Sequence, residues 1–116
     1  MDPHEVAFAA AHPESVDAGG GELFVDVHAA GAFLDELERR GLRLLGMEGF
    51  MVAPGAATVP SMDQIADLSD ASPTLALAEA RALIETWTAR PSAADHPALG
   101  GAGRHMIVFV VADPVS

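Results

Sequence analysis

The stretch that decides the fold is Leu42–Asp70, which reads LRLLGMEGFMVAPGAATVPSMDQIADLSD. It begins with a short hydrophobic strand pattern at Leu42–Leu45, and a glutamate, Glu48, follows between two glycines. A second hydrophobic run, Phe50–Ala53, leads into a Pro-Gly pair, which is typical of a turn. We therefore expect two strand pieces interrupted at the glycines, a turn, and a short returning arm after it.

The end of this stretch carries a helix-start signal. Ser61 is followed three residues later by Gln64, which is the spacing of a capping box. In a helix starting there, Asp63, Asp67 and Asp70 fall at i, i+4 and i+7 and share the outer face. The sequence thus predicts a short acid-bearing helix, whose aspartates either contact a partner or simply face solvent.

Glu48 has two readings. In strict strand alternation it shares a face with Leu44 and Phe50, where an unpaired carboxylate is unfavourable. Either a glycine bulge turns Glu48 outward, or the carboxylate has a partner. Burial would raise the pKa of this carboxyl and suit it to acid–base chemistry, but the sequence places no second catalytic group beside it. No catalytic residue is predicted.

The segment before Leu42 changes period from strand to helix. Glu22–His28 alternates apolar and polar residues, as a half-buried strand does. Ala29–Arg40 has apolar residues at helical spacing, and Gly41 suits the position just after its end. Strand, helix and strand in succession predict that Leu23–Val27 and Leu42–Leu45 run parallel in one sheet, or antiparallel if another strand intervenes.

The C-terminal half contains the second main helix and one more strand. Ser72 followed by Pro73 is an N-cap signal, and Thr74–Arg90 has a helical apolar face. His105–Asp113 is continuously apolar, which is typical of a central strand covered on both faces.

These patterns predict one α/β domain. We expect a mixed sheet of about four strands, two main helices and a short third helix. Residues 22–116 form this domain, and residues 1–21 form an N-terminal arm that includes a Gly-rich linker and, as one option, an edge strand.

Composition excludes several kinds of site. The 116 residues include no cysteine, and all six basic residues are arginine, so thiolate, cysteine–zinc and lysine chemistry are absent. The five histidines show no metal-binding spacing, although His28 and His105 both lie at strand ends. The sequence predicts neither a cofactor nor a metal site.

The chain is strongly acidic. Its formal net charge is −11, which makes nucleic acid and anionic membranes poor partners and favours a basic protein or a cation. Solubility alone is the simpler explanation of such a charge. No apolar run reaches the ~20 residues of a membrane span, and the N-terminal residues carry no basic charge, so a cytoplasmic location is expected.

The motifs LGMEGFMV and VPSMDQIADLS, between Leu44 and Ser69, resemble small acidic bacterial immunity proteins of polymorphic toxin systems. The resemblance implies a protein that is not an enzyme and that binds and blocks a toxin, often a basic nuclease. The contacts it implies are Glu48, Asp63, Asp67 and Asp70, with Phe50 or Met51 as apolar anchors.

The expected function is therefore inhibition of a basic bacterial toxin by a monomer or homodimer. A small carboxylate- or metal-dependent enzyme and a self-associating structural module are the alternatives.

Overall fold

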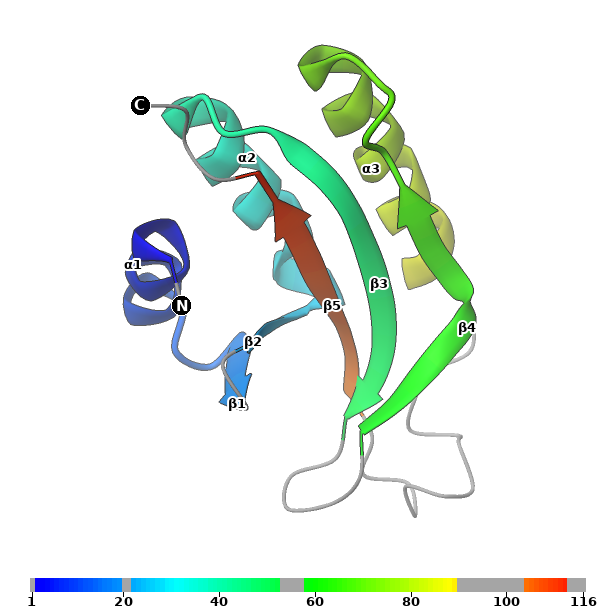
Figure 1. The fold of residues 1–116 in the computed structure, drawn as a ribbon. Coiled ribbons are helices and arrows are strands. Elements are labelled where there is room, and N and C mark those ends of the chain that lie inside the picture. Colours follow the sequence, from blue (N-terminus) through cyan, green and yellow to red (C-terminus); the bar gives the residue numbers. More distant parts are fainter. Residues whose placement is uncertain (1, 20–21, 53–57, 90–103, 113–116) are drawn as a thin grey trace.

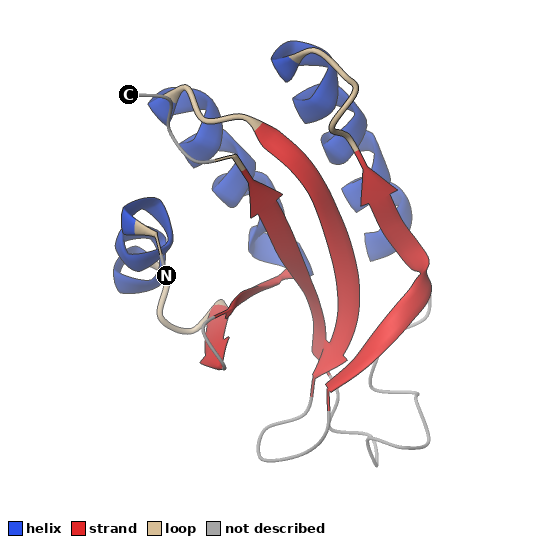
Figure 2. Cartoon of the chain, viewed as in Figure 1, coloured by secondary structure: helices blue, strands red, loops and turns tan. Residues whose placement is uncertain are grey.

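The computed structural model describes residues 2–19, 22–52, 58–89 and 104–112, and side chains are described throughout these ranges except at 18–19 and 58–63. The described chain forms helices and strands in alternating groups (Figures 1 and 2). In order, these are α1 (Pro3–Ala11), β1 (Val16–Gly19), β2 (Glu22–Asp26), a 3-10 turn (Val27–Ala29), α2 (Ala30–Arg40), β3 (Leu44–Val52), β4 (Thr58–Asp67), α3 (Pro73–Thr88) and β5 (Arg104–Val111). None of the described helices is long and apolar enough to cross a bilayer.

The strands form one sheet in the order β1-β2-β5-β3-β4. Every neighbouring pair is antiparallel. The predicted α/β class is confirmed, with five strands instead of about four and with antiparallel instead of mixed pairing. The additional strand is β1, and the pairing is antiparallel because β5, the last strand in the sequence, lies between β2 and β3.

The predicted strand–helix–strand unit is present, but another strand lies between its two strands. Because β2 and β3 are each antiparallel to β5, they run in the same direction, and α2 connects them. The expected parallel relation is therefore correct, although the two strands are not hydrogen-bonded neighbours.

Helices α2 and α3 cover one face of this sheet, and the core lies between them and the strands (Figure 1). The predicted apolar stripes are confirmed as the buried residues of the two helices, which are Ala30, Phe33, Leu34 and Leu37 in α2 and Ala76, Leu77, Ala80, Ile84 and Trp87 in α3. Phe109 of β5 stacks on Phe33 with ring centroids 4.7 Å apart. Each large side chain buried here contributes about 1.5–3 kcal/mol.

Both predicted helix-end signals are confirmed. Gly41 has φ +67° after α2, and the amide of Leu42 donates to the carbonyl oxygen of Leu37 at 2.9 Å. At the start of α3, the Ser72 hydroxyl oxygen accepts a hydrogen bond from the Leu75 amide at 3.2 Å.

The predicted helix at Ser61 is wrong, because residues 58–67 form strand β4. The local capping signal is overridden by β3, whose outer edge needs a backbone partner that this segment supplies. Asp67 therefore lies at the end of a strand and not on a helix face, and the predicted row of three aspartates along one helix does not exist.

Strand β3 is also continuous where the sequence predicted an interruption at the glycines. Gly46 and Gly49 allow close approach of β4: a Cβ on Gly46 would lie 2.8 Å from the Ala66 carbonyl oxygen, and a Cβ on Gly49 would lie 2.1 Å from Gln64 Oε1. The predicted Pro54-Gly55 turn lies outside the described residues.

The N-terminal arm is more ordered than predicted. The apolar run Glu5–Ala11, for which an edge strand and one helical turn were both possible, lies in helix α1, and its Phe8 ring packs edge-to-face on Phe33 at 5.0 Å. The edge strand falls at Val16–Gly19, within the segment expected to be a linker, and pairs with β2.

Two Gly→Ala substitutions should have opposite effects on stability. Gly41→Ala forces a side chain into the left-handed region and should lower the free energy of unfolding by about 1 kcal/mol. Gly31→Ala, in α2 with no atom within 4 Å of the new Cβ, should raise it by about 0.5 kcal/mol. Urea titration of both variants measures these changes, and a loss of stability in Gly31→Ala would contradict the described packing of α2.

Candidate functional site

The sheet face opposite α2 and α3 is the candidate site, and we call it the open face (Figure 1). Directly paired residues of an antiparallel sheet point to the same face, so the strand register assigns its members. Those with described side chains are Asp17, Glu22, Phe24, Asp26, Gly46, Glu48, Phe50, Val52, Ile65, Asp67, Arg104, Met106, Val108 and Val110.

The centre of the open face is apolar. Phe24 and Phe50 meet at right angles with ring centroids 5.5 Å apart, reaching toward each other across β5. Met106, on β5 between them, is fully buried although it points away from the core helices. Toward the other end of the sheet, Ile65 and Val110 expose 55% and 46% of their surface. The face therefore presents both aromatic and aliphatic side chains to its surroundings.

Four carboxylates lie around this apolar centre, and a fifth, Glu48, lies among its apolar side chains. The four are Asp17, Glu22, Asp26 and Asp67. Arg104 is the one basic side chain described on the same face, and it is engaged by Asp26 at 3.0 Å and by the Glu14 carbonyl oxygen at 3.1 Å. The described part of the open face is consequently strongly negative.

Glu48 takes the first of its two predicted readings. A register shift between Leu44 and Gly46 puts Leu44 on the core side and leaves Glu48 on the open face, exposed. Its cross-strand neighbours are Val108 and Ile65. The carboxylate thus lies between apolar side chains, with no basic or catalytic group paired opposite it.

Asp67 is held in its ionised form. Its carboxylate accepts hydrogen bonds from the Ser69 hydroxyl at 2.6 Å and from the Ser69 amide at 3.0 Å. These two bonds lower the pKa of Asp67, the hydroxyl having the larger effect. Asp67 therefore keeps its negative charge on the open face in mildly acidic solution.

The structure brings together only part of the predicted contact set. Glu48, Phe50 and Asp67 share the open face. Met51 points to the opposite side, where it pairs with His105. Asp70 is exposed in the turn after β4, and the side chain of Asp63 lies outside the described part of the chain.

The members of the open face from β1, β2 and β5 were missed by sequence reasoning. The alternation in Glu22–Asp26 and Arg104–Val111 shows which residues share a side, but only the strand order reveals that these sides adjoin Glu48 and Phe50.

A polar cluster lies on the core side of the sheet, where the pairing of β3 with β4 is interrupted by a bulge. Four residues of β4, 61–64, lie opposite the single residue Gly49 of β3. Gln64 is 4% exposed and packs on Gly49, and its Oε1 accepts a hydrogen bond of 2.6 Å from Nε2 of His105. This bond satisfies the buried amide oxygen and fixes the bulge to β5.

Burial lowers the pKa of His105, and nearby His28 lowers it further, while Asp26 acts in the opposite direction. A neutral His105 bonded to Gln64 stabilises the β4 bulge.

Comparisons of the chain with protein-family models, with curated proteins and with solved structures gave no match.

The Gln64–His105 pair should make folding stability depend on pH. Because the folded-state pKa of His105 lies below its ordinary value of 6.5, its neutral form stabilises the fold above pH 6.5, and this contribution is lost as pH falls through the lowered pKa. The urea concentration at the midpoint of unfolding should therefore fall more steeply for the wild type than for His105→Asn as the pH is lowered from about 8 to about 5, a range that spans the ordinary pKa of histidine. Parallel curves for the two proteins would contradict this assignment.

Proposed function

We propose that the protein binds a basic protein on the open face and that, in line with the resemblance to immunity proteins, this partner is a bacterial toxin that it inhibits. The observation that carries the proposal is the combination, on one sheet face, of apolar side chains with five carboxylates.

The apolar centre is the first support. An antiparallel sheet with one face on the core usually turns polar side chains to the other side. Here Phe24, Phe50, Val108, Ile65 and Val110 occupy that other side. Apolar side chains exposed on such a face favour an interaction site, in which a few central side chains carry most of the binding energy.

The carboxylates are the second support, and they favour a basic partner over a second copy of the chain. Two open faces, each carrying Glu48 and Asp67 and each belonging to a molecule with net charge −11, would repel one another. A basic protein would be attracted by the same field, which accelerates association and orients the approach. The apolar centre would then hold the complex once formed.

Charge reversal on the open face tests the electrostatic part of this proposal. The wild-type chain serves as bait to isolate the partner, and association rates are then measured with the purified pair. Glu48→Lys with Asp67→Lys should slow association by about tenfold or more at low salt, because both side chains are exposed and lie on the approach surface. High salt should reduce the difference.

The matched control is Glu79→Lys with Glu85→Lys, which makes the same charge change on exposed positions of α3. It should leave the association rate closer to that of the wild type. Equal slowing by both variants would mean that the partner responds only to net charge. The proposal would be overturned if the open-face variants capture the partner as well as the wild type does. It would also be overturned if the chain forms dimers without a partner.

Truncation of the exposed aliphatic side chains tests the apolar part. Ile65→Ala with Val110→Ala should raise the dissociation rate of the complex by about tenfold and change stability little, because both side chains are about half exposed in the free protein. Leu75→Ala is the control, since Leu75 is 50% exposed on α3. If Leu75→Ala weakens the complex as much as the open-face variant, the partner binds elsewhere.

A further inference from the structure

The first turn of α1 contains a buried histidine, His4, whose polar ring is required neither by the apolar core nor by the open face. His4 is only 5% exposed, and its ring meets the Phe33 ring edge-to-face at 6.1 Å. Among the described residues, no hydrogen bond is formed with either of its ring nitrogens. A buried imidazole left in this state calls for a ligand such as water or an ion.

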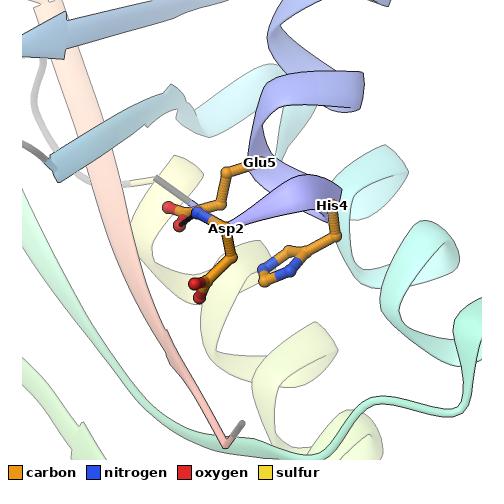
Figure 3. Close-up of side chains that lie close together, drawn as sticks. All are labelled: Asp2, His4 and Glu5. Carbon is orange, nitrogen blue, oxygen red and sulfur yellow. Dashed lines mark hydrogen bonds between the residues drawn. The ribbon is translucent and has the colours of Figure 1, made fainter. Parts of the chain in front are cut away.

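Two carboxylates lie beside this imidazole (Figure 3). One ligand atom each from Asp2, His4 and Glu5 forms a group in which all three atoms lie within 4.8 Å of one another. A point between three atoms at such separations is at most about 2.8 Å from each, so a small movement of the side chains brings all three to the roughly 2.0–2.2 Å of zinc–nitrogen and zinc–oxygen bonds.

We propose that Asp2, His4 and Glu5 bind one divalent transition-metal ion, of which zinc is the probe of choice. One imidazole nitrogen and two carboxylate oxygens are ligands that Zn²⁺ accepts, with water completing the coordination shell. A surface hollow of about 350 Å³ gives an ion access to the site, and it is lined by Asp2, Pro3, His4, Leu42 and Arg40, whose guanidinium is paired with Glu36. This inference is independent of the function proposed for the open face.

The capping geometry holds the ligands in place. Asp2 and Glu5 occupy the N-cap and N3 positions of a capping box, and the Asp2 amide donates to Glu5 Oε1 at 3.0 Å. A carboxylate has a second oxygen and further lone pairs, so it can accept this bond and still bind a metal. The helix dipole places roughly half a positive charge at this end, which two carboxylates outweigh.

Metal binding would fasten α1 to the body of the protein. His4 and Phe8 are the two buried residues of α1, and both contact Phe33 of α2. An ion that binds the folded arrangement and not the unfolded chain stabilises the fold by mass action. The consequence is a zinc-dependent rise in the melting temperature.

The test separates metal binding from helix capping. Asp2→Asn with Glu5→Gln removes both charges but keeps residues that cap a helix equally well. After chelator treatment, the wild type should bind one Zn²⁺ per chain in isothermal titration and melt at a higher temperature with zinc. The double variant should melt like the metal-free wild type and lose zinc affinity by more than roughly tenfold.

Two further variants complete the design. Glu14→Gln with Asp17→Asn makes the same change in charge within the same arm and should retain zinc affinity. His4→Phe keeps an aromatic ring against Phe33 and should lose the affinity for zinc. The proposal is overturned if the wild type shows no one-to-one binding of zinc, or if either ligand variant binds zinc as the wild type does.

Discussion

The structure depends on the pairing of β5 with both β2 and β3. These two antiparallel ladders place the last strand in the middle of the sheet and separate the two strands that α2 connects. The same strand supplies Ile107 and Phe109 to the core and Met106, Val108 and Val110 to the open face. Because a central strand is apolar on both sides, the choice of β5 for this position creates a core and an apolar outer surface together.

Local sequence signals were sufficient where helices pack on the core. The spacing of Phe33 and Leu37, the left-handed Gly41 and the Ser72 cap all predicted what is observed, because each depends on residues within one or two turns. The continuous apolar pattern of β5 likewise identified a central strand. It was also predicted to be covered on both faces, and among the described residues α2 and α3 cover one of them, while the open face is the other.

Structural features that depend on residues distant in the sequence could not be predicted from local patterns. The capping box at Ser61 is a valid local pattern, but β3 offers this segment a whole ladder of hydrogen bonds, and Gln64 is buried against Gly49 and His105 instead of completing a cap. The composition of the candidate site could likewise be predicted only in part. Glu48 and Phe50 stand out in the sequence, whereas Phe24 joins them only through the strand order, which loop lengths and periodicity do not determine.

The acidic charge and the apolar centre have to be explained together. Solubility alone accounts for a net charge of −11 without requiring any particular placement of the carboxylates. It does not account for Ile65 and Val110, which remain exposed on a sheet face where polar side chains would serve solubility better. Carboxylates around and within such a centre discourage contact with other copies of the same chain and leave the apolar surface available to a positively charged protein. In the proposed complex, the carboxylates would therefore select the partner by charge, and the apolar side chains would retain it by contact.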